Sequence, residues 1–295
     1  VAQTASPLLA FDHPTEDDLL ADAAADPGSA EVWRQLGLWQ LGQNQGNDYE
    51  WPSGIPEPGL EIEGIDQYLS EIDNQSLLMP RANFPIPEIA SKTRYFGMVS
   101  GTMESDAIIR RSSPFKIFDG KVVPSLALSA YIAAHPGCKL KIEGNVLYVD
   151  SHPVPLDKDS NTVLNYRGPS QTHQTRSIAS VIDSEIRIMN GDDPSFDPSV
   201  FTNAYVFVGF TASGLRDLRP TPLSREFPGV EIHATMLDNM LSDDFIRDTS
   251  AATMYSITIL FALLAGFLGI SCTNWKHTIA CFAVLTPLPF ILGIV

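Results

Sequence analysis

The clearest pattern of apolar and polar residues lies between residues 204 and 241. Residues 204–210 form a nearly continuous apolar run, Ala-Tyr-Val-Phe-Val-Gly-Phe, which predicts a buried strand. Small and turn-forming residues follow at 211–217, and apolar residues recur at helical spacing over 232–241. Together these patterns predict an α/β unit. Ligands of open α/β sheets bind beyond the C-terminal ends of strands, so the loop after this strand is a candidate site.

Four stretches before this unit also carry regular patterns. Apolar residues between 62 and 72 recur at the spacing of a helix. Residues 124–134 predict a second helix, because proline suits a first helical turn. Residues 139–150 alternate as a hairpin does, and residues 178–182 predict a short helix. This part of the chain therefore mixes helices with strands.

The C-terminal part of the chain is apolar on all faces. Residues 253–272 supply about the 20 apolar residues that a hydrocarbon core requires, which predicts a first transmembrane helix. Residues 278–295 predict a second transmembrane helix, truncated where the sequence stops. Lys276 lies between the two, while aspartates flank the other end of the first span. The positive-inside rule therefore places Lys276 in the cytoplasm and the large preceding domain outside it.

Composition and charge limit the classes of partner. The chain has 295 residues, of which 44% are hydrophobic and 18% charged, as in globular proteins. Its formal net charge is −16, and Lys276 is the only charged residue after residue 250. An acidic domain lacks the basic footprint that nucleic acid requires, and it does not dock flat on anionic lipid. Solubility is the simplest use of this charge.

No catalytic or metal-binding motif is present in the sequence. Cys138 is the one cysteine outside the apolar tail, so no intrachain disulfide framework can form in the domain that precedes the tail. The six histidines are scattered without metal-ligand spacing, and we expect neither a metal nor another cofactor. The sequence also lacks a G-x-S-x-G elbow, a P-loop and a paired-carboxylate motif, so it gives no support to catalysis within this chain.

Several phrases of the sequence are shared with one protein family. They are FVGFTASGLRDLRPTPL at 207–223, PGVEIHATMLDNML at 228–241 and NYRGP at 165–169. A Phe-Gly strand at 95–99 and an Arg-Arg strand within 106–115 accompany them. This combination resembles the CHASE2 domain, the extracytoplasmic sensory module of bacterial transmembrane receptors.

The resemblance implies an extracytoplasmic α/β sensor domain over residues 1–250, followed by the transmembrane helices at 253–272 and 278–295. Family members carry a membrane helix and a first β-α unit before the phrase that matches residues 6–22. The chain is therefore expected to be truncated or atypical at its start. The resemblance also implies a place in the bacterial inner membrane, a homodimer, and an unidentified small-molecule or envelope ligand.

The loop after the predicted strand contains the first candidate ligand-binding residues. Thr211 and Ser213 offer hydroxyl groups, and Arg216 and Asp217 offer charges of opposite sign. These groups can hold a small ligand. Alternatively, they can satisfy backbone groups and tie the loop to a neighbouring element.

A second group of candidates includes Arg110, Tyr166 and Arg167. Arginines gathered in an acidic domain can form an anion-binding pocket. They can equally pair with carboxylates of the same domain, and the sequence leaves both alternatives open.

The third group lies on the helix predicted after residue 231. His233 is a candidate pH-sensitive switch, because histidine titrates near physiological pH, although a packing role is the alternative. Asp238 and Asn239 follow on the same helix, which is expected to run on towards the first membrane span. These three residues are therefore candidates for relaying a signal.

Three functions fit these observations. The first is the sensory input region of a receptor, which passes a signal through membrane helices to a cytoplasmic output domain. The second is part of a receptor enzyme, a nucleotide cyclase, diguanylate cyclase or kinase, whose catalytic domain lies beyond residue 295. The third is a membrane scaffold that assembles with copies of itself.

Overall fold

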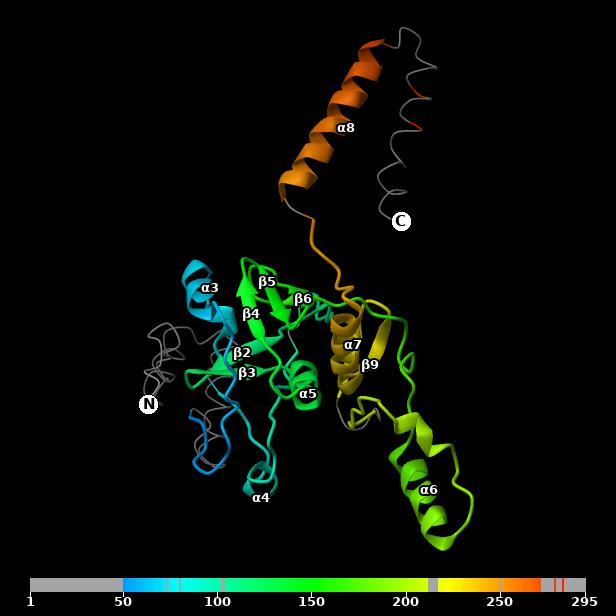
Figure 1. The fold of residues 1–295 in the computed structure, drawn as a ribbon. Coiled ribbons are helices and arrows are strands. Elements are labelled where there is room, and N and C mark those ends of the chain that lie inside the picture. The colour runs from blue at the N-terminus through cyan, green and yellow to red at the C-terminus, as the bar shows by residue number, and fades with distance from the viewer. Residues whose placement is uncertain are drawn as a thin grey trace, which may run out of the picture. The chain divides into compact units, whose positions relative to one another are not determined.

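The computed structural model describes residues 50–72, 74–79, 81–101, 104–211, 217–249 and 251–271, together with residues 279 and 283. The chain divides into two compact units, Val1–Arg247 and Asp248–Val295 (Figure 1). The first 49 residues of the predicted sensor domain, including the family phrase at 6–22, lie outside the described residues.

The described elements alternate between short helices and short strands. The helices are α3 (Ile65–Glu71), α4 (Pro87–Ala90), α5 (Leu126–Ala134), α6 (Ile178–Asn190), α7 (Gly229–Ser242) and α8 (Ala251–Ser271), with the 3-10 turns η2 (Asn74–Leu77) and η3 (Pro198–Phe201). The strands are β1 (Arg111–Ser112), β2 (Phe115–Phe118), β3 (Lys121–Pro124), β4 (Leu140–Glu143), β5 (Val146–Val149), β6 (His152–Pro155), β7 (Thr162–Val163), β8 (Leu218–Thr221) and β9 (Ser224–Pro228).

Within the described residues, the strands form four antiparallel sheets. The pairs are β1 with β7, β2 with β3, and β8 with β9, while β4, β5 and β6 form a three-stranded sheet. Parallel contacts between these residues occur only as isolated bridges, such as Met98 with Ser125. The mixture of helices and strands is consistent with the predicted α/β class. The Phe-Gly strand predicted at 95–99, however, is reduced to this single bridge.

Two predictions from local pattern are confirmed in the sheet region. The hairpin at 139–150 is β4 and β5, with Gly144 in the left-handed region of its turn at φ 55°. The helix predicted at 124–134 is α5, which begins two residues later because Ser125 is its N-cap and accepts a hydrogen bond from Leu128 N at 3.2 Å. Pro124 ends strand β3 instead of opening the helix.

Helix α7 confirms the helix predicted around residues 232–241 and packs against α5, β6 and β9 (Figure 1). It turns four large apolar side chains into the core, namely Ile232, Met236, Leu237 and Met240. Burial of such a side chain stabilises the fold by roughly 1.5–3 kcal/mol. The helix ends at Ser242, and Asp243 follows in the left-handed conformation at φ 55°. It therefore does not continue directly into the next helix.

The buried strand predicted at 204–210 is wrong. This segment has no regular structure, and it pairs with no strand among the residues that the structure describes. Tyr205 and Phe207 pack partly on the core, whereas Val206, Val208 and Phe210 are 57%, 79% and 64% exposed. An apolar run forms a strand only when a neighbouring backbone supplies hydrogen-bond partners, and no described strand runs beside this one.

Helix α6 is longer than the helix predicted at 178–182. Ser177 caps its first turn, and Gly191 ends it at φ 84°. Four of its apolar side chains, Ile178, Ile182, Ile186 and Met189, are more than half exposed. The prediction was too short because the polar residues after position 182 belong to one face of an amphipathic helix.

The second unit contains α8, which has 21 residues and no charged side chain. Many of its large apolar side chains are exposed in the isolated chain, among them Ile259, Leu263 and Phe267. Among the residues that the structure describes, no helix is both long enough and apolar enough to cross a membrane. The transmembrane helix predicted at 253–272 therefore remains a prediction. The one at 278–295 lies outside the described residues, apart from residues 279 and 283.

Candidate functional site

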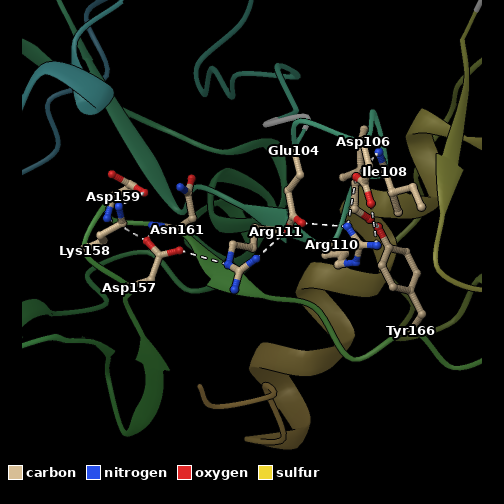
Figure 2. Close-up of polar contacts among 11 residues, drawn as sticks. Glu104, Asp106, Ile108, Arg110, Arg111, Asp157, Lys158, Asp159, Asn161 and Tyr166 are labelled. Atoms are coloured by element: carbon tan, nitrogen blue, oxygen red, sulfur yellow. Dashed lines mark hydrogen bonds and ion pairs between the residues drawn. The ribbon is translucent and has the colours of Figure 1, made fainter. Parts of the chain in front are cut away.

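The arginine pair at 110 and 111 lies in a network of carboxylates, which Figure 2 shows. Glu104 bridges the two guanidinium groups. Its Oε2 lies 2.7 Å from Nη1 of Arg110, and its Oε1 lies 2.5 Å from Nη1 of Arg111. Arg110 also contacts Asp106 at 2.9 Å, and Arg111 contacts Asp157 at 3.1 Å. Both arginines therefore pair with carboxylates of their own domain.

This network fixes a turn and a strand pair. The hydrogen bonds from Arg110 lower the pKa of Asp106, which also accepts a bond from Ile108 N at 3.0 Å. Asp157 accepts two backbone bonds of 2.9 Å, from the N–H groups of Asp159 and Asn161. These contacts hold the ends of β1 and β7 together, so the network has a clear structural role.

Tyr166 lies beside this network but is buried. Its hydroxyl donates a hydrogen bond to the carbonyl oxygen of Ile109 at 3.0 Å, and its ring meets Phe227 edge-on at 5.3 Å. Burial raises the pKa of the Tyr166 hydroxyl. The structure therefore places Tyr166 next to the backbone that precedes Arg110, where its hydroxyl is already used.

Arg167 contacts a different part of the molecule. Its Nε binds Asp238 on α7, and its two terminal nitrogens bind both carboxylate oxygens of Asp244, with Nη2 to Oδ1 at 3.0 Å. A paired, two-pronged contact of this kind is among the stronger charged hydrogen bonds in proteins. The guanidinium holds the pKa of Asp244 below its usual range, and the carboxylates raise the pKa of Arg167.

Asp244 belongs to the segment that leaves the first unit, residues 243–247, which we call the exit segment. Three other contacts hold it on the domain. Nδ1 of His152 lies 2.8 Å from Oδ1 of Asp243, Phe245 is 7% exposed in the core, and Ile246 bridges Val163 of β7. The exit segment is therefore attached to the sheet, and Arg167 ties it to α7.

Asn239 supports the same region from inside. It is fully buried, and its side-chain oxygen accepts a hydrogen bond from Asn165 N at 2.8 Å. Its side-chain nitrogen donates to Asn165 O at 3.0 Å. The predicted relay residues Asp238 and Asn239 therefore contact residues 167 and 165, within the NYRGP phrase.

The first half of α7 is fixed by the chain that follows this phrase. Glu231 is buried and accepts hydrogen bonds from Ser170 Oγ at 2.9 Å and Gln171 N at 2.8 Å. Nε2 of His173 lies 3.1 Å from Oγ1 of Thr235. Residues 165–173 thus follow α7 along its length, with a polar contact at each turn.

His233 lies on the second turn of α7 and is 7% exposed. Burial lowers its pKa, while a hydrogen bond with the backbone of Val99 and the charge of Asp217 act in the opposite direction. Its Nδ1 atom has no hydrogen-bond partner among the described residues. His233 is therefore buried, as the packing role requires, and one of its ring nitrogens has no hydrogen-bond partner among the described residues.

The loop predicted to bind a ligand is described only at its ends. Thr211 is exposed, and Ser213 and Arg216 lie outside the described residues. The carbonyl oxygen of Asp217 accepts a hydrogen bond from Gly229 N at 2.9 Å, and a Cβ atom on Gly229 would come within 2.5 Å of Asp217 Oδ1. Asp217 therefore packs against the start of α7, where a carboxylate is favourable.

Among the residues that the structure describes, the groove beside β4 does not join these candidates, and no metal site does. A groove of about 810 Å³ runs beside β4 and contains none of the ten predicted residues; its lining includes Glu61, Cys138 and Tyr148. Among the described side chains, no group of three or more His, Cys, Asp and Glu is placed to hold a metal ion.

The sequence patterns did not indicate the partners of these residues. Glu104, Asp157 and His152 hold the network and the exit segment, yet none of the three stands in a recognisable motif, and Asn165 belongs to the NYRGP phrase without having been selected as a candidate. The run from Asp157 to Asn161 indicates a turn, since Asp and Asn bind backbone groups two residues on. That signal predicts the turn but not the ion pair of Asp157 with Arg111.

Comparison with known proteins gives one match. The family model of the CHASE2 domain matches residues 7–269, which is most of the chain. No curated protein and no solved structure matches it significantly. The phrases at 165–169 and 228–241 lie at α7, as do Gly209 and Asp217 of the phrase at 207–223, and the match is consistent with this geometry. The chain belongs to the CHASE2 domain family, and so contains an extracytoplasmic sensor module of membrane receptors.

Proposed function

We propose that this chain is the sensory input region of a bacterial transmembrane receptor, in which α7 and the exit segment pass a signal to a membrane helix. The observation that carries the proposal is the position of Arg167, which binds α7 through Asp238 and the exit segment through Asp244. A change at this residue therefore acts on both elements at once. The family's sensory role supports the same reading.

The proposal places a ligand-dependent step at Arg167. An anionic ligand that bound this guanidinium would compete with Asp244, because both need the same terminal nitrogens. Binding would then free the exit segment from one of its contacts. A ligand shifts such an equilibrium only by its difference in affinity for the two states, and competition for one arginine provides that difference.

The proposal also places the chain in the inner membrane as a homodimer, with residues before 248 outside the cytoplasm. The support for the membrane position is the chemistry of α8. Helix α8 contains no charged residue over 21 positions, and its exposed apolar side chains are costly to hydrate. The output domain to which the helices would pass the signal would lie on the cytoplasmic side, after Lys276.

The test is to break the contact between Arg167 and Asp244 and to observe the exit segment. Arg167→Met keeps the apolar stem but removes the charge, whereas Arg187→Met removes an exposed ion pair with Asp183 on α6. Hydrogen exchange of residues 243–247 is measured in the full chain in lipid nanodiscs. We expect exchange to become about tenfold faster in Arg167→Met and unchanged in Arg187→Met. Equal exchange in both variants would refute a relay through Arg167.

A further inference from the structure

We propose that His233 is a proton-binding site, through which acidification outside the cytoplasm loosens the first half of α7. The inference rests on the proposed sensory function and names a signal for it. The observation behind it is that His233 is buried, yet its Nδ1 has no hydrogen-bond partner among the described residues.

The hydrogen-bond pattern assigns the roles of the two ring nitrogens. Nδ1 has no hydrogen-bond partner among the described residues, and an interaction with the backbone of Val99 favours the protonated ring, so we infer that Nε2–H, and not Nδ1–H, lies towards Val99 O. In a neutral imidazole the remaining nitrogen is then a bare acceptor. A proton is the one ligand that this atom can take without a cavity.

Few charged groups surround the ring to compensate a positive charge. Asp217 faces it from the segment before β8. Glu231, on the same helix, already accepts bonds from Ser170 and Gln171. Helix α5, which packs on α7, contains no charged residue.

The other elements that pack on α7 place their charged or titratable groups against other residues. In residues 165–173, His173 contacts Thr235 and Arg167 contacts Asp238. Arg225 and Glu226 of β9 are exposed, and His152 of β6 binds Asp243 at the far end of the helix. A protonated His233 would therefore be a buried cation with an N–H group that lacks an acceptor among the described residues, and both features are costly.

The direction of the pH effect follows from this burial. The pKa of His233 is lowered in the folded domain, whereas an unfolded histidine titrates near about 6.5. The packing around His233 is then fully stable above about pH 6.5 and loses stability as the pH falls below that value. Asp244, with its lowered pKa, stays ionised through this range. Acid therefore acts on the first half of α7 while Arg167 still holds the second half.

The residues that cover His233 leave it close to solvent. The side chain of Val99 is 69% exposed, and residues 100 and 101 are also exposed. Met98 attaches the same segment to the start of α5, through bonds to Pro124 O at 2.8 Å and from Leu126 N at 2.9 Å. Because Met98 is held at α5, the proposal places the entry of water at residues 99–101.

The experiment measures hydrogen exchange of residues 97–101 and 229–236 in the full chain, in nanodiscs, at about pH 7.5 and about pH 5.5, after correction for the intrinsic rate. His233→Gln keeps a donor near Val99 but cannot be protonated. His173→Gln is the matched control, since His173 contacts the same helix from outside. We expect protection to fall about fivefold at the lower pH in the wild type and in His173→Gln, and to stay constant in His233→Gln. An equal fall in His233→Gln would overturn the proposal.

A second measurement covers the case in which His233→Gln does not fold. The wild-type histidine ring signals are then titrated by NMR with selective ¹³C labelling. The proposal requires one signal to titrate together with the loss of protection at 229–236. If all observable histidine signals titrate while protection is unchanged, the proposal fails.

The two proposals fail separately. If acid loosening depends on His233 but Arg167→Met leaves residues 243–247 unchanged, the proton site stands and the relay through Arg167 does not. If Arg167→Met releases the exit segment but His233→Gln responds to acid as the wild type does, the relay stands and the proton site does not.

Discussion

Asn239 is fully buried, and its amide group occupies both hydrogen-bonding groups of the Asn165 backbone. Asn239→Leu keeps the volume but leaves a backbone donor and an acceptor without partners. Each unsatisfied buried group costs about 1–3 kcal/mol, so we expect the free energy of unfolding to fall by about 2–6 kcal/mol. Urea unfolding of the full chain in detergent, followed by circular dichroism, measures this loss.

The control for this prediction is Asn190→Leu, at the exposed end of α6. A surface substitution of this kind changes stability by less than about 0.5 kcal/mol. If Asn239→Leu costs no more than the control, the amide is not needed to satisfy the Asn165 backbone.

Single residues show how far the sequence predicts the site. Arg110, Arg167 and His233 were selected as candidates from their charge or titration and from family phrases. Their partners Glu104, Asp244 and Val99 lie between 6 and 134 positions away in the chain, so only the tertiary fold brings them together. Local pattern therefore predicted which groups are unusual, but not whether each is paired.

Gly97 shows why one element needs a particular residue. A Cβ atom at this position would lie 2.5 Å from Leu126 Cα and 2.9 Å from Leu126 N, both in the backbone of the α5 start. Gly97→Ala must push the two segments apart, and we expect it to cost roughly 1–3 kcal/mol. The melting temperature of the full chain tests this, with Gly101→Ala as the control, since its nearest atom is the flexible end of Ile109 at 3.3 Å. Equal melting temperatures would show that the segments separate freely.

Elements with local contacts were predictable, and those with distant partners were not. Helix α7 and the β4–β5 hairpin follow from spacing, capping and a glycine turn that lie within one stretch of sequence. The apolar run at 204–210 has the composition of a strand, but a strand also needs neighbours, and none of the described strands pairs with it. Composition alone therefore predicted the wrong state for the stretch that had the strongest apolar signal.

We expect the exit segment to loosen when Asp244 loses its charge, either by protonation in acid or by substitution. Arg167 lowers the pKa of Asp244, so this carboxylate stabilises the folded state above its unfolded pKa of about 3.9, and that contribution is lost as the pH falls below it. Asp244→Asn should therefore loosen the segment even at neutral pH. Arg247 is exposed, so limited trypsin digestion measures cleavage after it. We expect faster cleavage in Asp244→Asn than in Asp183→Asn, which removes the carboxylate of an exposed pair on α6. Equal rates would mean that other contacts alone hold the segment.

At the scale of the whole molecule, charge and apolarity are separated along the chain. The formal charge before residue 251 is −17, because the net charge is −16 and Lys276 is the only later charge. The matched family region runs to residue 269 and so includes most of α8. An acidic domain followed by an uncharged helix is consistent with the proposal that the domain lies in water outside the cytoplasm and that the helix lies in lipid.

This arrangement predicts which side of the membrane each part reaches. In a background with Cys138, Cys272 and Cys281 replaced by serine, we introduce Glu185→Cys on exposed α6, or Lys276→Cys together with His277→Lys, which keeps one positive charge between the predicted spans. A membrane-impermeant maleimide added to intact spheroplasts should label the α6 cysteine, because the domain faces outward. The other cysteine should react only after the membrane is opened, because the positive-inside rule places position 276 in the cytoplasm. Labelling of both before opening, or of position 276 alone, would contradict an extracytoplasmic domain anchored by α8.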